Sequence, residues 1–181
     1  MKRPTAQAHE VVSEAVRPGD TVVDATAGNG HDTLFLARLV GERGKVIAFD
    51  VQPAAIESTR RRLEAAGVTE RVELHCESHT HMASWAEADS VRAVMFNLGY
   101  LPGGDHSLIT RTTYTLPALD AAADLLAPGG VLTVVCYPGH SGGAEESEAV
   151  RAWIEARGGE VFPQAREGAP FLVVWERSYF A

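Results

Sequence analysis

The sequence predicts an α/β protein built around a mainly parallel sheet. Short β-branched, apolar runs alternate with longer helical patterns, which favours right-handed β–α–β crossovers. Glycine- and proline-rich turns separate the two kinds of segment. Polar residues also stand at the ends of successive predicted strands: Asp24, Asp50, Ser78, Asn97 and Tyr137. Ligands of open α/β sheets bind beyond these carboxyl ends, so the pattern also predicts where the site lies.

Seven segments have the composition of strands. Lys45–Val51 is a nearly continuous apolar run, typical of a strand covered on both faces, whereas Arg71–Ser78 alternates. The last two segments are expected to form an antiparallel hairpin. The predicted strands are Thr21–Asp24, Lys45–Val51, Arg71–Ser78, Val91–Asn97, Val131–Tyr137, Glu160–Gln164 and Phe171–Arg177.

The segments between them have helical patterns, so helices are expected on both faces of the sheet. Pro53 stands at a helix start, and Gly67 stops the same helix. The turn Pro128-Gly129-Gly130 is expected to close the helix before the fifth predicted strand. Met82 and Trp85 are expected on the inner side of their helix. The predicted helices are Thr5–Val16, the segment after Gly30 that carries Leu34–Leu36, Ala54–Ala66, His79–Ala88, Thr110–Leu126 and Ala144–Arg157.

Bulk properties favour one domain over residues 1–181, without disulfides or metals. The net charge of −8 argues against broad non-specific binding to nucleic acid, although a local basic patch remains compatible with it. Cys76 and Cys136 lie in apolar runs and are expected to be buried thiols, and no zinc-ligand spacing is present. With no leader-like N-terminus and no apolar run long enough to cross a bilayer, the expected location is the cytoplasm.

The stretch Thr21–Ala37 predicts a strand, a glycine turn and a helix start, which together form a ligand cradle. A dinucleotide fingerprint would need a third glycine where Thr33 stands, which disfavours NAD. The pattern D-x-x-x-G-x-G, with Asp24, Gly28 and Gly30, resembles instead the first motif of class I S-adenosylmethionine (SAM)-dependent methyltransferases. That resemblance implies that Asp24 helps to hold the cationic methionine part of the cofactor.

Asp50 stands at the spacing expected for an acid that binds ribose hydroxyls. Val51 and Gln52 could flank the adenine. Ser78 and His79 could contact the adenine edge, although Ser78 could equally cap the next helix.

The fourth predicted strand ends in N-L-G-Y, Asn97 to Tyr100. This resembles the Asn/Asp-Pro-Pro-aromatic motif of amino-group methyltransferases, with Leu98 and Gly99 in place of the prolines. There the Asn side-chain carbonyl accepts a hydrogen bond from the substrate amine and aims its lone pair at the methyl group, while the aromatic ring holds the substrate.

Three stretches together resemble a bacterial family once described as rRNA methylases: Asp24 to Thr33, Phe96 to Asp105 and Gly139 to Glu146. Characterised members are tRNA wobble-uridine methyltransferases that convert 5-aminomethyl-2-thiouridine to 5-methylaminomethyl-2-thiouridine with SAM. The resemblance covers nearly the whole chain, and Pro138 before Gly139 departs from the family pattern.

The resemblance implies a class I methyltransferase fold of Rossmann-like type, SAM as cofactor and a tRNA anticodon stem-loop as partner, without membrane or metal. The implied catalytic residues are Asn97, Tyr100, Asp105 and His140. The implied cofactor-binding residues are Asp24, Thr26, Gly28, Asn29, Gly30, His31, Asp32, Asp50, Gln52, Ser78, His79 and Asn97. A base is optional; His31, Asp105, His106 and His140 are its candidates.

Other functions stay open: methylation of another RNA, a small molecule or a protein, a non-catalytic nucleotide-binding module, and a nicotinamide oxidoreductase. A homodimer also stays open. Arg60–Arg62 are expected to be a solvated helix face. Lys2, Arg3 and Arg111 are better placed to meet RNA.

Overall fold

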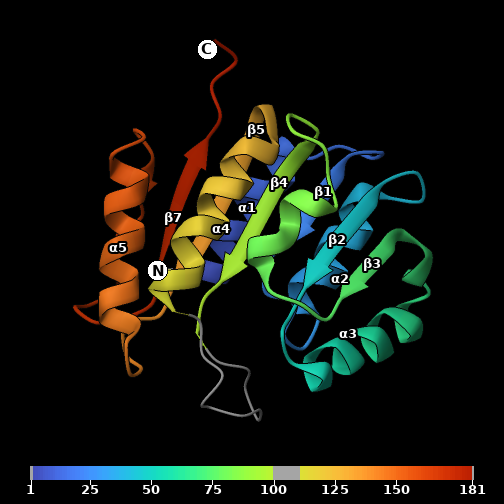
Figure 1. Cartoon of the computed structure of the whole chain (residues 1–181), viewed down its shortest axis with the longest axis horizontal. Helices are drawn as coiled ribbons and strands as arrows, with labels where there is room; N and C mark the ends of the chain where they lie inside the picture. The colour runs from blue at the N-terminus through green and yellow to red at the C-terminus, as the bar shows by residue number, and fades with distance from the viewer. Residues whose placement is uncertain (1, 100–110, 181) are drawn as a thin grey trace.

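A computed structural model of the chain describes residues 2–99 and 111–180 (Figure 1). A seven-stranded sheet with the order β3-β2-β1-β4-β5-β7-β6 forms its centre. The strands are β1 (Thr21–Asp24), β2 (Lys45–Phe49), β3 (Val72–His75), β4 (Val91–Asn97), β5 (Leu126–Cys136), β6 (Glu160–Val161) and β7 (Phe171–Glu176).

The first five strands are parallel, and β7 runs antiparallel to both β5 and β6. The strand order reverses between β1 and β4, which places the topological switch point at these two strands. The predicted fold class is therefore confirmed: a mainly parallel sheet with an antiparallel C-terminal pair.

Helices cover both faces of the sheet (Figure 1). Helices α1 (Pro4–Ala15), α2 (His31–Val40) and α3 (Pro53–Ala66) share one apolar cluster, which includes Val12, Leu36 and Leu63. Helices α4 (Thr112–Leu125) and α5 (Gly143–Glu155) share the other, with Leu119 and Ile154. Burial of these side chains against the sheet stabilises the layers by about 25 cal/mol for each Å² removed from water.

The predicted helix over residues 79–88 is wrong. The chain forms a short 3₁₀ helix there, η2 (His79–Ser84), and a second, η1 (Thr69–Arg71), precedes β3. Met82 is buried as expected, but Trp85 is 42% exposed. Its ring lies 3.7 Å from that of His75, and its Nε1 donates to Glu77 Oε1. Histidine, threonine and serine are poor helix formers, so this segment lacks the propensity for a full α-helix.

Two further predictions at the sheet are wrong. Strand β3 ends at His75 on the edge of the sheet, so Cys76 lies beyond it and is exposed, whereas Cys136 is buried. Strand β5 begins at Leu126, so Pro128–Gly130 belong to its start and do not form a separate turn. The pairing of β4 with β5 shifts register there, because partners step from Val91↔Leu126 to Ala93↔Val131. Such a bulge accommodates the extra residues.

Among the described residues, no helix combines the length and the apolar composition that a membrane crossing requires. The two termini lie at opposite ends of the sheet, with the N-terminus near the end to which β4 points (Figure 1).

Candidate active site

The glycine turn forms a tight loop between β1 and α2. Gly30 is the N-cap residue of α2 and has a φ of 80°, in the left-handed region that favours glycine. A Cβ at this position would lie 2.9 Å from Thr59 Cα of α3. The loop therefore packs closely on α3 and presents its backbone beside the start of a helix, where N–H groups lack helical partners.

Asp50, directly after β2, is bound to this loop. Its Oδ2 accepts a hydrogen bond from Gly28 N at 3.0 Å, and its Oδ1 accepts one from Gln52 N at 2.9 Å. Since a carboxylate has about four acceptor positions, further acceptor capacity remains for a hydroxyl donor.

Asp24 lies at the end of β1 and is fully buried. Its carboxyl oxygens accept hydrogen bonds from Thr26 N at 3.1 Å and from Thr33 Oγ1 at 2.6 Å. Burial raises the pKa of Asp24 to about 7; the charge of Asp32 adds to the rise, and the two hydrogen bonds oppose it. Thr33, the residue in place of a third glycine, thus holds Asp24 within the fold.

Asn97, the last residue of β4, lies at the switch point. Its backbone N donates to Thr26 Oγ1 at 2.7 Å, and its side-chain Nδ2 donates to Asp32 Oδ2 in a long bond of 3.4 Å. The amide nitrogen is thus directed at Asp32, and the amide oxygen is by its chemistry an acceptor of hydrogen bonds.

Asp32 also contacts helix α1. His9 Nε2 lies 2.6 Å from Asp32 Oδ1, and the His9 ring stacks on Phe35. The contacts from His9 to Asp32 and from Asp32 to Asn97 thus connect α1, α2 and β4. Sequence reasoning did not find His9, because a lone histidine on an amphipathic helix carries no signal of its partner.

Tyr137, which follows β5, completes this group. Burial raises the pKa of the Tyr137 phenol, the Asp32 carboxylate adds to the rise, and a hydrogen bond with the Asn97 side chain opposes it. The phenol therefore stays protonated at neutral pH beside the Asn97 amide.

Ser78 and His79 make contacts within the fold. Ser78 Oγ accepts from Thr80 N at 3.2 Å, so it caps η2, which is the alternative left open above. His79 Nδ1 donates to Ala25 O at 3.0 Å. Burial lowers the pKa of His79, which leaves the imidazole neutral at neutral pH.

Asn29 and His31 face α3. Asn29 Oδ1 accepts from Ser58 Oγ at 3.2 Å, and Asn29 O accepts from Arg62 Nε at 2.7 Å. His31 Nε2 lies 3.3 Å from Arg62 Nη2. Arg62 therefore supports the glycine loop, and its predicted assignment to a solvated face is wrong.

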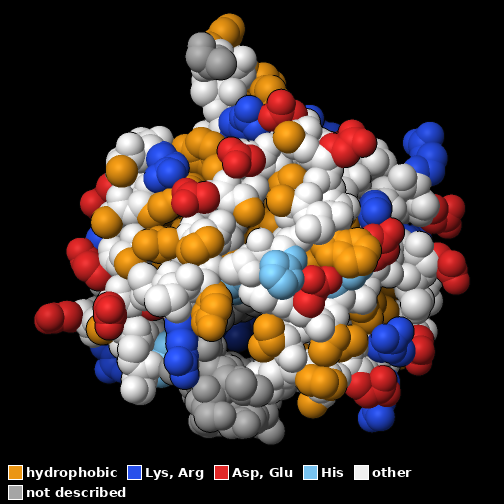
Figure 2. Space-filling view, viewed as in Figure 1, with side chains coloured by type: hydrophobic (Ala, Val, Ile, Leu, Met, Phe, Trp, Pro, Cys, Tyr) orange, Lys and Arg blue, Asp and Glu red, His pale blue; other side chains and the backbone are white. Residues whose placement is uncertain are grey.

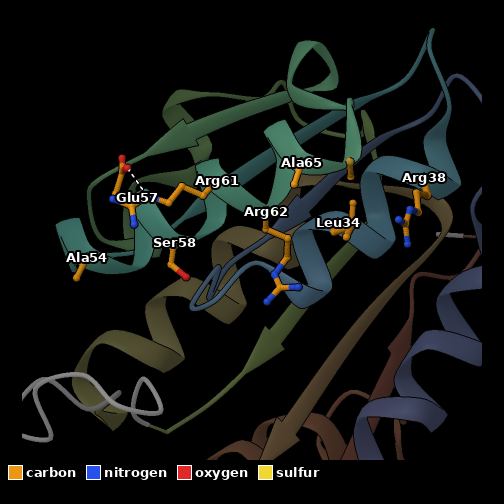
Figure 3. Close-up of a pocket in the computed structure, with 9 residues that line it drawn as sticks. Leu34, Arg38, Ala54, Glu57, Ser58, Arg61, Arg62 and Ala65 are labelled. Atoms are coloured by element: carbon orange, nitrogen blue, oxygen red, sulfur yellow. Dashed lines mark hydrogen bonds and ion pairs between the residues drawn. The ribbon is translucent and has the colours of Figure 1, made fainter.

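A groove lies between α2 and α3 and is lined by Arg38, Arg61 and Arg62 (Figure 3). Arg61 is paired there with Glu57 at 2.8 Å. The groove is on the outer side of the two helices and contains none of the predicted site residues, so it does not itself identify a cofactor site.

The second and third sequence motifs meet at the ends of β4 and β5. A Cβ at Gly99 would lie 3.8 Å from both Tyr137 Cδ2 and His140 Nε2. His140 Nδ1 donates to Ser141 O at 3.0 Å. Tyr100, Asp105 and His106 lie outside the described residues. Across residues 2–99 and 111–180, no group of three or more acidic, histidine or cysteine side chains is arranged to hold a metal.

Comparison with known proteins agrees with this geometry. The model of a family described as "Putative rRNA methylase" matches residues 46–162. A protein of Arabidopsis thaliana named tRNA (mnm(5)s(2)U34)-methyltransferase, chloroplastic, is 46% identical over 161 residues, which cover 84% of this chain and 59% of that protein. The chain thus spans less than two thirds of that relative.

Two solved structures share the fold over nearly their whole length. One, from Clostridium thermocellum and described as a "putative rRNA-methylase", is 42% identical with a TM-score of 0.92 and covers 97% of this chain and 98% of that chain. The other, a "putative methyltransferase" from Streptococcus mutans in complex with SAH, is 33% identical with a TM-score of 0.84 and the same coverage.

Proposed function

This chain belongs to the family described as "Putative rRNA methylase", and from that membership we propose that it is a SAM-dependent N-methyltransferase of tRNA. The proposed reaction converts 5-aminomethyl-2-thiouridine to 5-methylaminomethyl-2-thiouridine at the wobble position. The name of the 46% identical relative supports this substrate. The observation that carries the proposal is the Asn97 amide, held at the switch point by Asp32.

The residues present fit the cofactor. Gly30 carries no side chain, so the backbone of the turn at the start of α2 would be able to approach the methionine part of SAM. Asp50 would hold the ribose with the acceptor positions that Gly28 and Gln52 leave open. Asp24 acts by anchoring the loop, since its carboxyl group is fully buried. When bound, SAM supplies a methyl group that is electrophilic because of the neighbouring sulfonium.

Asn97 and Asp32 position the substrate. The substrate amine resembles lysine, with a pKa of about 10, and it must lose a proton before it can attack. The Asn97 oxygen accepts a hydrogen bond from the neutral amine and directs its lone pair, while Asp32 fixes the orientation of the amide. Tyr100, Asp105 and His140 are proposed to complete the substrate side of the site.

The test is methyl transfer from labelled SAM to tRNA from a strain that lacks the modification, followed by mass analysis of the nucleosides. We expect 5-methylaminomethyl-2-thiouridine to appear. Binding of SAH without label in the wobble uridine would refute the tRNA substrate.

The family description favours one second candidate, a methyltransferase of rRNA. A parallel reaction with labelled SAM therefore uses ribosomal RNA from the same strain as the methyl acceptor. Label confined to rRNA would replace the first proposal with the second.

A further inference from the structure

A pocket of about 310 Å³ lies where the start of the chain meets the connection from β6 to β7. Its lining includes Lys2 and Arg3 from the start of the chain, and Pro163, Ala165 and Ala169 from the connection between β6 and β7. Tyr137 also lines it. Since Tyr137 follows the last residue of β5, the pocket opens at the carboxyl end of the parallel strands. Its volume is near the lower end of the range for small-ligand pockets, about 300–1,000 Å³.

The pocket adjoins the proposed amine site. Tyr137 connects the two, because its phenol interacts with the Asn97 side chain while its residue lines the pocket. A group bound in the pocket would therefore sit next to whatever Asn97 positions.

The lining combines apolar and cationic groups. None of the described lining residues is acidic, although the chain has a net charge of −8. Lys2 is paired with Glu10 at 2.7 Å, whereas Arg3 is exposed and has no ion pair within the described part of the chain. Acidic and basic side chains are interspersed over the face drawn in Figure 2, whereas the described lining of this pocket includes basic and no acidic side chains.

This combination suits a nucleotide of single-stranded RNA. Aromatic and apolar side chains contact a base irrespective of its identity, and arginine neutralises the phosphate. The groove between α2 and α3 is a less suitable site for an RNA nucleotide. Its Arg61 is paired with Glu57, and its Arg62 donates a hydrogen bond to Asn29 O.

We propose that this N-terminal pocket binds the RNA nucleotide next to the methylated uridine, an inference that rests on the proposed function. The base lies against Tyr137 and Pro163, and the phosphate lies beside the Arg3 guanidinium. The pocket thereby places the anticodon strand so that the modified uridine reaches Asn97.

The test compares binding of an unmethylated anticodon stem-loop by the wild-type chain and by R3Q across a range of salt concentrations. Loss of one phosphate contact should weaken binding and reduce the slope of log K against log salt by about 0.7. The matched control is R38Q, which removes one exposed arginine from the α2–α3 groove and should leave the slope unchanged.

A second variant, A165W, tests the pocket by filling it. Ala165 is exposed at the pocket rim, so the larger side chain can be accommodated without disturbing the core. We expect stem-loop affinity to fall about tenfold while SAH affinity stays at the wild-type value.

Wild-type slopes and affinities in both R3Q and A165W would overturn the pocket assignment, as would a reduced slope in R38Q alone. Neither result affects methylation by the wild-type chain, so neither contradicts the proposed function. A wild-type chain that neither binds nor methylates the stem-loop would instead overturn the proposed function together with the pocket.

Discussion

His9 Nε2 lies 2.6 Å from Asp32 Oδ1, and the His9 and Phe35 rings stack with centroids 3.8 Å apart and planes within 2°. Since a carboxylate accepts hydrogen bonds, the imidazole donates. The other oxygen, Asp32 Oδ2, receives the Asn97 amide. His9 is therefore a positioning residue that acts on Asn97 through Asp32.

We expect H9A to lower kcat for methyl transfer by about tenfold to a hundredfold, because loss of the His9 contact lets Asp32 and the Asn97 amide move from the productive geometry. KM for tRNA and the affinity for SAH should change little. In H9Q, an amide donor can replace the imidazole, so part of the rate should return. Steady-state kinetics and calorimetry measure these quantities.

The matched control for His9 is H81A. His81 also pairs with a carboxylate, Glu77, at 2.9 Å, but on the exposed side of η2. This variant should retain the wild-type kcat. Equal losses in H9A and H81A would contradict a specific role for His9.

Replacement of Asp50 should weaken cofactor binding. D50A removes the carboxylate that accepts from Gly28 N and Gln52 N and that is proposed to hold the ribose. Hydrogen bonds to a charged group contribute about 1.5–3 kcal/mol, so the Kd for SAH should rise about tenfold to a hundredfold. Calorimetric titration with SAH measures it.

For comparison, D120A removes a surface carboxylate that pairs with Arg157 at 3.0 Å on helix α4. Its affinity for SAH should equal that of the wild type. An unchanged Kd in D50A would show that Asp50 does not contact the cofactor.

Asp24 should make stability depend on pH. Its pKa is about 7 in the folded chain, compared with about 3.9 for an unfolded aspartate. Between these values the folded state retains a proton that the unfolded state releases. The resulting stabilisation is complete below about pH 4 and is lost as the pH rises to about 7.

The variant D24N is uncharged at every pH, so its free energy of unfolding should fall less than that of the wild type between about pH 4 and about pH 7. Urea titrations at several pH values measure the difference. D120N provides the control, since Asp120 is exposed and D120N should follow the wild-type curve. Parallel curves for D24N and the wild type would contradict the raised pKa.

Gly30 should tolerate substitution less than Gly67. Both have positive φ, 80° and 68°, so alanine at either position costs about 1–2 kcal/mol from backbone strain. A Cβ at Gly67 would have no atom within 4 Å, whereas a Cβ at Gly30 would lie 2.9 Å from Thr59 Cα. G30A should therefore lose more stability than G67A and should also bind SAH more weakly.

Chemical denaturation and SAH titration of G30A and G67A test this comparison. The same loss of stability in both variants, with SAH affinity intact, would show that the turn can move away from α3.

Local patterns in the sequence predict most of the fold. β-branched runs and glycine turns identify the strands, and the polar residues after them identify the ligand-binding edge, because parallel strands end at one edge. These patterns failed at residues 79–88 and at Pro128–Gly130, where weak propensity and a bulge in the pairing of β4 with β5 decide the structure.

The sequence by itself determined the glycine cradle, the aspartate after β2 and the asparagine that ends β4, because each depends on its neighbours along the chain. Only the tertiary structure decided that Asp24 is enclosed, that Arg62 supports the loop, and that His9 reaches Asp32, 23 residues away. Those relationships depend on how α1, α2 and α3 pack on the sheet. Side-chain pairs of this kind leave no periodic signal in a single sequence, since packing alone brings the partners together.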